Sequence, residues 1–333
     1  MMKQACKYNV FTGFNMPETQ SIVSMVPQEM AQQRLDQVVA SLYPQYSRSQ
    51  LQKWIRAGKV LVDDKVLKPK ERLIGGERLA VFPQAEVRTD SVPEPMLLDI
   101  VHEDDDLLVI NKPAGLVVHP AAGNWSGTLV NALLHHDPQL ETLPRAGIVH
   151  RLDKDTTGLL VVARTLEAHQ ELVRQLARRT VSREYLALVI RPVVAGGTIE
   201  APVGRHHVDR KRMAVTEAGK PAITHYRIEE RFRHHTLLRV ALETGRTHQI
   251  RVHMSHRQMP IVGDPVYGGR SRVPAGISEA LRETLRAFPR QALHATALGL
   301  VHPATGEEVW WERELPQDME NLLLALRVET AEV

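Results

Sequence analysis

Apolar residues fall into two differently patterned regions with a polar stretch between them. Residues 32–83 combine short stripes of helical spacing with short apolar runs, whereas residues 97–330 alternate strand-length apolar runs with amphipathic segments. The intervening residues 84–96 are polar and carry two prolines, which predicts a linker. Residues 1–31 show no sustained period and predict a flexible extension. The chain therefore predicts two folded domains of unequal size.

The first region predicts two helices followed by a β-ribbon. A stripe at i, i+3, i+4 and i+7 opens the region, and a second helix follows Ser47, a residue suited to the N-cap, and ends at Gly58. The segments 60–62 and 79–81 then predict the ribbon. The inward positions of the two helices are Leu35, Val38, Val39, Leu42, Leu51 and Ile55.

Cations gather on the second of these helices. Positive charge grouped on one helix suits a nucleic-acid backbone, and a solvated helix face is the ordinary alternative for such a group. The pattern by itself leaves both interpretations open. The group comprises Arg48, Lys53, Arg56 and Lys59, with Trp54 among them.

The second region predicts strands interleaved with helices. Apolar segments of strand length occur at 107–110, 159–163, 185–190, 237–242 and 293–301, and we expect the last of these to be the final strand. Helices are predicted at 128–136, 166–179, 248–256 and 278–288, with Thr247 as the N-cap of the third.

Composition places few limits on the partner. The 333 residues include 42 lysines and arginines against 39 aspartates and glutamates, so an argument for nucleic acid must come from clustering of charge. The single cysteine, Cys6, allows neither an internal disulfide nor a thiolate metal site, which predicts a reducing, cytoplasmic location. No apolar run approaches the ~18 residues of a membrane span, and the N-terminus lacks the layout of a signal peptide.

The stretch 150–158, H-R-L-D-K-D-T-T-G, concentrates charge and runs directly into the apolar segment 159–163. A buried strand cannot hold these charges, so they must lie in a polar loop at its edge, where functional sites tend to occur. Asp153 and Asp155, at i and i+2, invite a division of acid and base work. For an isolated D-K-D, a solvated turn is the simpler interpretation.

A second unusual cluster begins the predicted helix 248–256. Arg246, His248 and Arg251 crowd a helix N-terminus, where the helix dipole disfavours positive charge. We therefore expect a carboxylate or a phosphate close to these side chains.

Neither candidate for metal binding is strong. His253 and His256 have the spacing of ligands, but the flanking arginines repel cations and no carboxylate or thiolate is near them in the sequence. The acidic stretch 103–106 lacks the spacing of a calcium loop and predicts a solvated turn. The sequence motifs of NTPases, serine hydrolases, zinc proteases and dinucleotide-binding proteins are absent.

Five motifs recur in a defined order along the second region: N-K-P-A-G at 111–115, H-R-L-D-K-D-T-T-G at 150–158, R-E-Y at 183–185, G-R-T-H-Q-I-R-V-H at 245–253 and G-D-P-V-Y-G at 263–268. They resemble the RluA family of pseudouridine synthases over roughly residues 97–320. Residues 32–83 resemble the S4 RNA-binding domain, through R-L-D at 34–36, S-R-S-Q-L at 47–51, I-R-A-G-K-V-L-V at 55–62 and G-G-E at 75–77. The resemblance implies an α+β fold, with a mixed, largely antiparallel central sheet flanked by helices behind a small α/β S4 domain.

The resemblance also implies the chemistry, which isomerises a uridine within RNA to pseudouridine at a catalytic aspartate, here Asp153. Arg251 matches the arginine that pairs with this aspartate, and Tyr185 matches the tyrosine that stacks on the target base. Arg151 matches the residue that holds the flipped nucleotide. Asp155 is expected only to order the loop, and whether Asp153 adds covalently or removes the 2′ proton is open.

The other expected RNA contacts are Arg246 and His248 here, and Arg48, Lys53 and Arg56 in the S4 segment. No metal and no organic cofactor is implied.

The combination of an S4 domain with the sequence of residues 144–158 resembles that of family members that act on large-subunit rRNA. This implies uridines in the helix 69 stem-loop of 23S rRNA, presented as free rRNA or in the large ribosomal subunit, and a monomeric cytoplasmic enzyme. The alternatives are a relative that modifies another rRNA site and a non-catalytic S4-domain protein that binds ribosomal RNA. A nuclease using Asp153 and Asp155 is a further alternative, but it lacks the metal ligands such enzymes show.

Overall fold

A computed structural model describes residues 21–331 except 45, 47, 84–90, 121–122, 210–211 and 269–272. The chain divides into two compact units, residues 1–90 and 91–333, each with a hydrophobic core of its own. The division falls within the predicted linker 84–96. Most of the predicted extension, with Cys6, and the predicted N-cap Ser47 lie outside the described residues.

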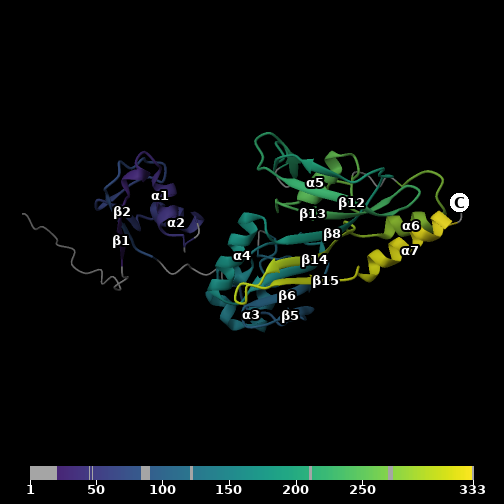
Figure 1. Ribbon diagram of the computed structural model, residues 1–333, viewed down its shortest axis with the longest axis horizontal. Helices are drawn as coiled ribbons and strands as arrows, with labels where there is room; N and C mark the ends of the chain where they lie inside the picture. Colours follow the sequence, from purple (N-terminus) through teal and green to yellow (C-terminus); the bar gives the residue numbers. More distant parts are fainter. Residues whose placement is uncertain are drawn as a thin grey trace, which may run out of the picture. The chain divides into compact units, whose positions relative to one another are not determined.

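The N-terminal unit packs two helices against a small antiparallel sheet whose strands lie in the order β1-β4-β2-β3 (Figure 1). Asp63 and Asp64 both adopt positive φ angles, 46° and 62°, and close the turn between β2 and β3. Asp is among the few non-glycine residues that tolerate this conformation. The elements are β1 (Ile22–Met25), α1 (Leu35–Leu42), α2 (Arg48–Arg56), β2 (Val60–Val62), β3 (Lys65–Val66) and β4 (Arg78–Val81).

Strand β1 corrects the prediction that residues 1–31 form an extension outside the fold. Its residues pair with β4, Ile22 opposite Val81 and Met25 opposite Arg78, and Val26 just after it is buried in the core of the unit. Four residues are too few to display a periodic pattern, and the partner strand lies more than fifty positions further along the chain. Only the pairing in three dimensions reveals this strand.

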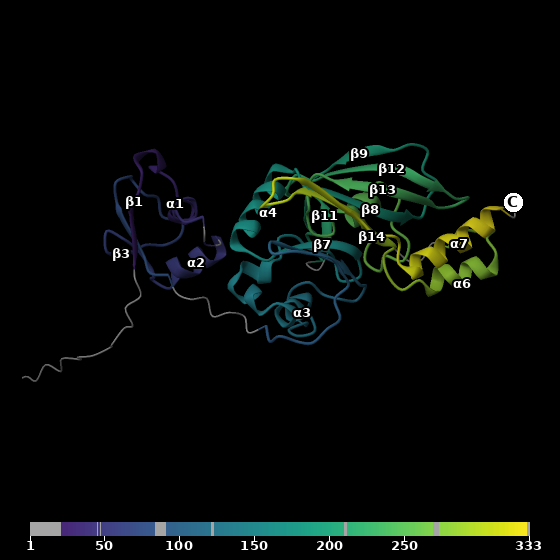
Figure 2. The same ribbon diagram turned by 60° about the horizontal axis from the view of Figure 1, so that its bottom comes forward.

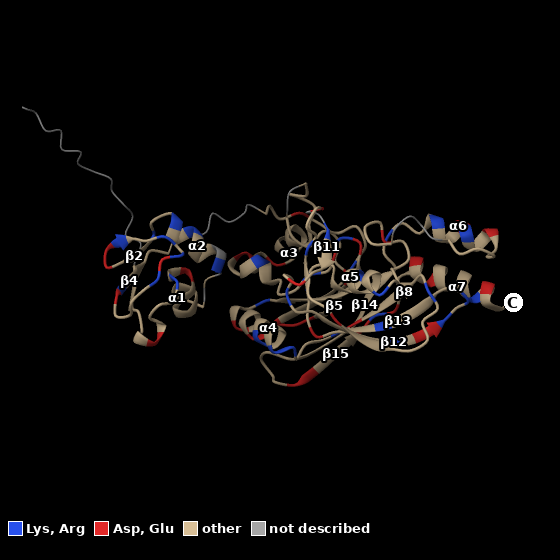
Figure 3. Ribbon diagram, turned by 90° about the horizontal axis from the view of Figure 1, so that it is seen from above, with Lys and Arg blue, Asp and Glu red and all other residues tan. Residues whose placement is uncertain are grey.

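Helix α2 separates an apolar face from a charged one. Leu51 and Ile55 are fully buried, whereas Lys53 and Arg56 are exposed, as the predicted stripe requires. The Lys and Arg positions of α2 are blue in Figure 3. Trp54 is also buried and its ring meets Tyr46 edge-on at 4.8 Å, so it belongs to the core and not to the basic face. The helix is followed by Gly58 with φ of 69°, as expected at a helix C-terminus.

The larger unit is built on a mixed sheet, and its described residues give the strand order β5-β6-β7-β14-β8-β13-β12-β9, with β15 paired to β14 (Figures 1 and 2). Every neighbouring pair is antiparallel except β7 with β14, which confirms the predicted α+β class with a largely antiparallel sheet. The strands are β5 (Ile100–Glu103), β6 (Leu107–Lys112), β7 (Thr157–Ala163), β8 (Ser182–Val189), β9 (Gly197–Glu200), β12 (Ile223–Arg231), β13 (Thr236–Leu242), β14 (Leu293–Val301) and β15 (Glu308–Glu312).

Helices flank both faces of this sheet. They are α3 (Leu129–His136), α4 (Leu166–Arg178), α5 (Gln249–His256), α6 (Glu279–Ala287) and α7 (Gln317–Ala331), and a short ribbon of β10 (Val203–Arg205) and β11 (Met213–Val215) lies apart from the main sheet. Alternate residues of β6 and β7 enter two different cores. Leu108 and Leu160 face the core that includes α3 and α5, whereas Leu107 and Leu159 face the core that includes α4. Burial on both faces explains why β7 is a continuous apolar run.

The chain continues beyond the strand that we expected to be the last. After β14 it returns as β15, paired antiparallel to β14, and ends in α7, which lies beside α6 in both views (Figures 1 and 2). The residues of β15 alternate between half-buried and exposed, and its sequence E-V-W-W-E gives too short a signal to distinguish from a loop.

A substitution at Gly158 tests how closely β7 and β14 approach each other in the parallel pair at the centre of the sheet. Its φ is +110°, and an added Cβ would lie 2.2 Å from the Ala295 carbonyl oxygen. Gly306 is the matched control, because its φ is +74° and an added Cβ would meet nothing within 4 Å. We expect Gly306→Ala to cost about 1–2 kcal/mol for the backbone conformation alone. Gly158→Ala should cost at least ~2 kcal/mol more because β7 and β14 must also move apart. Urea unfolding of both variants measures the difference, and equal costs would show that the two strands are not so closely apposed.

Candidate active site

Side chains point in alternate directions along the extended segment before β7, and this alternation places Asp153 in a pocket. Ile148 forms a bridge to Val162 of β7, and the His150 Nε2 accepts the backbone N–H of Val161 at 3.1 Å. Leu152 is buried in the core, so the side chains on either side of it face away from that core. His150 is thus a structural acceptor. Burial, with a smaller effect from a nearby arginine, lowers its pKa to about 3 and keeps the ring neutral.

Buried cations hold the backbone of the loop that follows Asp153. The Lys112 ammonium donates to the carbonyl oxygens of Lys154 at 2.8 Å, Pro113 at 2.7 Å and Leu116 at 3.0 Å, matching its three N–H groups. Burial lowers the pKa of Lys112 to about 7 against the opposing effect of two nearby aspartates. Arg290 donates to the Asp155 carbonyl at 3.3 Å. Lys112 was not among the predicted site residues, although a lysine at the end of a strand that begins L-L-V-I was the available signal.

The structure brings Arg251 together with Asp153. The Arg251 Nη1 donates to Asp153 Oδ2 at 2.9 Å, while its Nε and Nη2 bind the two oxygens of Asp264 at 2.7 and 2.9 Å. Asp264 also accepts the backbone N–H groups of Val266 and Tyr267, both at 2.9 Å. These two carboxylates supply the anionic partner expected for the cations at the start of α5.

The ion cluster shifts the pKa values of Arg251 and Asp264. Burial would lower the pKa of the Arg251 guanidinium, but Asp264 and Asp153 outweigh it and the pKa lies above its ordinary value. Burial would likewise raise the pKa of Asp264, yet the arginine outweighs it and the pKa lies below its ordinary range. Asp264 was not among the predicted site residues, and its place in the G-D-P-V-Y-G turn gave no sign of a charge partner.

His248 begins α5 in a left-handed conformation, with φ of 57°, which corrects the prediction that Thr247 is the N-cap. The first turn is stabilised instead by the Gln249 side chain, whose Oε1 accepts the backbone N–H of Arg246 at 3.0 Å. This geometry turns the His248 ring toward the site. Its Nδ1 lies 2.8 Å from the Tyr267 hydroxyl and its Nε2 lies 3.8 Å from Asp153 Oδ1, and burial lowers its pKa.

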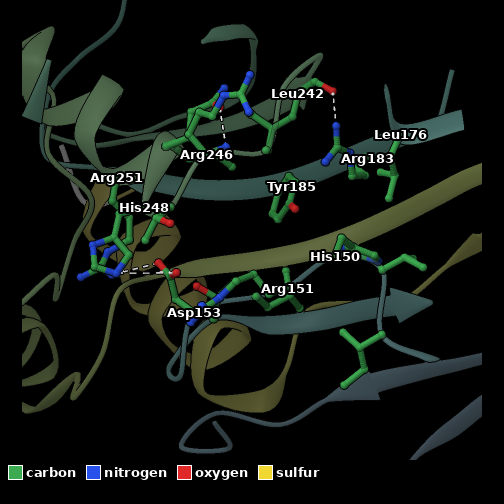
Figure 4. A pocket seen from close by; sticks show the side chains of 18 of the residues that line it. His150, Arg151, Asp153, Leu176, Arg183, Tyr185, Leu242, Arg246, His248 and Arg251 are labelled. Atoms are coloured by element: carbon green, nitrogen blue, oxygen red, sulfur yellow. Dashed lines mark hydrogen bonds and ion pairs between the residues drawn. The ribbon is translucent and has the colours of Figure 1, made fainter. Parts of the chain in front are cut away.

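One cavity of about 570 Å³ gathers the predicted residues of this domain (Figure 4). Tyr185 projects into it from β8, and burial raises the pKa of its phenol. Arg151 is exposed beside Asp153, and Arg246 donates from Nε to the Pro221 carbonyl at 3.1 Å. All six predicted residues line the cavity: Asp153, Tyr185, Arg251, Arg151, Arg246 and His248.

The three predicted residues of α2 belong to the other unit and differ from one another. Arg48 Nη2 donates to Asp36 at 3.3 Å, and the same carboxylate is bound by Arg34 and Gln52 at 2.9 and 2.8 Å. Arg48 is therefore engaged within its own unit. Lys53 and Arg56 are exposed on the basic face of α2.

Nothing in the described part of the chain gathers three or more histidine, cysteine, aspartate or glutamate side chains in the manner of a metal site. His253 is buried, with its ring nitrogens 2.9 Å from the Thr224 hydroxyl and the Ala201 carbonyl. Asp104 does not lie in a merely solvated turn, because its carboxylate accepts two backbone N–H groups and contacts His102 and His302 at 2.5 and 3.1 Å.

No helix of the described residues is long and apolar enough to cross a bilayer.

Comparison with known proteins places these features in a family. A family model described as RNA pseudouridylate synthase matches residues 106–256, and the S4 domain model matches residues 33–79. The chain is 58% identical to "Ribosomal large subunit pseudouridine synthase D" of Pseudomonas aeruginosa over 91% of its length and 94% of the relative. It is 54% identical to the protein of that name from Escherichia coli K12, over 95% of this chain and 98% of the relative. The solved structure of human RNA Pseudouridylate Synthase Domain Containing 4 superposes with a TM-score of 0.54 and 28% identity, covering 68% of this chain and 92% of that one.

Substituting Asp264 tests the ion cluster. Asp264→Asn leaves the buried Arg251 with one anionic partner, and breaking a buried pair of this kind typically costs about 3–5 kcal/mol. The matched control is Glu230→Gln, which breaks the half-exposed pair with Arg327 at 2.8 Å and should cost under ~1 kcal/mol. Urea unfolding at neutral pH measures both.

The same variants supply a pH readout. Because the folded-state pKa of Asp264 is depressed, its contribution is fully present above the unfolded value of ~3.9 and is lost as pH falls through the folded value. The gap in unfolding free energy between the parent and Asp264→Asn should therefore close below about pH 4. A gap that is independent of pH would show that the charge of Asp264 is not what stabilises the cluster.

Proposed function

The chain belongs to the RluA-type pseudouridine synthases with an N-terminal S4 domain, and from that membership we propose that it isomerises uridine to pseudouridine in the RNA of the large ribosomal subunit. The reaction breaks the bond between C1′ and N1, turns the uracil within the site, and joins C1′ to C5. The C5 proton then leaves and N1 takes up a proton, so the product has the same composition as the substrate.

The observation that carries the proposal is the position of the Asp153 carboxylate. One of its oxygens is fixed by Arg251 at 2.9 Å, while Oδ1 makes no hydrogen bond within the described part of the chain and has His248 at 3.8 Å. The carboxylate is thus oriented through one oxygen and has the other open to the pocket. An ionised oxygen is required whether Asp153 adds to C1′ or removes the 2′ proton.

Tyr185 and Arg151 have complementary roles in this proposal. Tyr185 stacks its ring on the uracil, a role that a neutral phenol performs. Its raised pKa disfavours the phenolate that proton removal from C5 would need. Arg151, exposed at the rim, helps to hold the flipped nucleotide, since a stacked base must be extruded before C1′ is reachable. A cavity of about 570 Å³ is within the range for a site that takes one such nucleotide.

The substrate is proposed to be 23S rRNA, with the modified uridines in the helix 69 stem-loop. The names of the relatives from Pseudomonas and Escherichia support the large subunit. The match of residues 144–158 to family members that act on this stem-loop supports the finer site. The enzyme is proposed to work as a cytoplasmic monomer without metal or organic cofactor, on free rRNA or on the assembling subunit.

Asp153→Asn provides the direct test. Unmodified 23S rRNA and large subunits are incubated with the parent or the variant, and pseudouridine is mapped by a chemical probe that blocks reverse transcription. The parent should modify helix 69 and Asp153→Asn should form no product while binding RNA with similar affinity, because the substitution removes the reactive carboxylate and leaves the cations that bind RNA in place. Asp155→Asn is the control and should keep its activity, since the loop uses the backbone carbonyl of Asp155. Modification elsewhere would refute only the helix 69 site, and no modification of either substrate would refute the enzymatic proposal.

The basic face of α2 is proposed to bind the rRNA backbone. The double variant Lys53→Gln/Arg56→Gln should bind 23S rRNA more weakly and reduce the salt slope of binding by about one for each phosphate that the protein no longer neutralises. Its rate on saturating RNA should match that of the parent, because the catalytic pocket is untouched. Lys65→Gln, which removes an exposed cation from β3 of the same unit, is the control. An unchanged salt slope in the double variant would remove α2 from the RNA interface.

A further inference from the structure

Arg183 is a buried arginine that the chemistry described so far does not use. It lies on β8 two residues before Tyr185, so both side chains face the same side of the sheet, and both line the catalytic cavity. The side chain is 8% exposed. Its Nη2 contacts the carbonyl oxygens of Leu242 and Glu243 at 3.5 and 3.3 Å, and its buried Nε has no hydrogen-bond partner in the described part of the chain.

The other buried arginines show what Arg183 lacks. Arg251 has two carboxylates, and Arg290 has both oxygens of Asp318 at 2.7 and 2.8 Å. No carboxylate of the described residues pairs with Arg183. The nearby Glu243 directs its own side chain to Arg179 at 2.9 Å and to a histidine. A buried guanidinium without an anion is costly, so a partner is expected from outside the chain.

The turn before α5 leaves space for this guanidinium. An added Cβ at Gly245 would lie 2.7 Å from the Arg183 Nη1, and the φ of Gly245 is not in the left-handed region. Only the far end of the arginine side chain would have to shift to admit a Cβ, so Gly245 lets the guanidinium keep its present place and is not required by the backbone conformation. The same turn carries Arg246 and His248 into the cavity, so the wall of the site is shaped around Arg183.

The charge of the cavity indicates what the missing partner is. Its lining within the described residues holds one carboxylate, Asp153, which is already bound by Arg251. An excess of guanidinium groups favours an anionic ligand, and the planar fork of arginine matches the oxygens of a phosphate. The arginines that line the cavity are Arg145, Arg151, Arg183, Arg246 and Arg251.

We propose that Arg183 binds a phosphate group of the RNA strand next to the uridine that reacts at Asp153, an inference that rests on the proposed function. In Figure 4 Tyr185 lies between Asp153 and Arg183. The Cα atoms of Arg183 and Tyr185 are separated by about 6.6 Å along the strand, which seats a base on Tyr185 and an adjoining phosphate on Arg183. The phosphate supplies the Nε of Arg183 with its acceptor. Arg183 is thus a substrate-binding residue that does not touch the reacting atoms.

Arg183→Gln tests this role by separating binding from chemistry. Binding of unmodified 23S rRNA is measured against salt concentration in the Asp153→Asn background, and the single-turnover rate at saturating RNA is measured in the active enzyme. We expect at least tenfold weaker binding near 0.1 M salt, a salt slope reduced by about one, and a saturating rate within about threefold of the parent. Arg183→Lys should recover the salt slope and only part of the affinity, because lysine keeps the charge without the fork.

Arg191→Gln is the matched control, since this exposed arginine follows the far end of β8. It should leave both the affinity and the salt slope unchanged. Parent-like affinity and salt slope in Arg183→Gln would overturn the proposal. So would a lowered melting temperature and a slower saturating rate with unchanged affinity, which would make Arg183 a structural donor to the carbonyls of Leu242 and Glu243.

Synthetic RNA stem-loops with one uncharged methylphosphonate linkage locate the phosphate. A linkage placed 5′ or 3′ of the target uridine should weaken binding of the parent at one of the two positions and should cause no further loss in Arg183→Gln. Equal losses in both proteins at both positions would refute the contact. These assays measure RNA binding independently of pseudouridine formation. If the parent protein binds RNA without forming product, the proposed function is refuted, and the binding data still decide the role of Arg183.

Discussion

Arg251 is buried between two carboxylates, and the arrangement of three separate segments depends on that pairing. Asp153 comes from the loop before β7, Arg251 from α5 and Asp264 from the turn after it. A buried guanidinium needs anionic partners to offset its desolvation, and the arginine in return holds the pKa of Asp264 below its ordinary range. The cluster therefore holds the segments together and fixes the orientation of the Asp153 carboxylate. In the proposed reaction, the contacts that stabilise these segments also orient the reacting carboxylate.

The loop of Asp153 is further held by cations that bind its backbone. Lys112 at the end of β6 and Arg290 just before β14 donate to the carbonyls of Lys154 and Asp155, the residues directly after Asp153. Arg290 is itself paired with Asp318, so the positive charge around the site comes from the arginines that line the cavity, which outnumber its one carboxylate. Such a field suits a polyanionic substrate and would disfavour a metal ion. The exposed cations of α2 add the same preference in the N-terminal unit.

Local rules predicted the elements whose signals are strong within a few residues. The segment 159–163 indicated a strand buried on both faces, and β7 is one. The helix expected at 166–179 exists as α4, with the Thr165 hydroxyl accepting the backbone N–H of Ala168 at 3.1 Å. Predictions failed where long-range partners decide the outcome. Strand β1 forms because it pairs with β4, and Trp54 is buried because it packs against Tyr46 and the core of the unit.

The sequence alone determined the two-domain organisation, the class of the larger fold and a set of polar motifs too specific to be structural turns. It also required an anion near the start of α5, because cations do not gather at a helix N-terminus without one. Only the tertiary structure decided that Asp264 binds Arg251 beside Asp153, and that Arg183 is buried without a carboxylate partner among the described residues. The pair of Asp153 and Arg251 was expected through the family resemblance and not from periodicity, because a charge pair across 98 residues leaves no periodic trace in the sequence. The order of the strands in the sheet determines which distant residues come together in such a cluster.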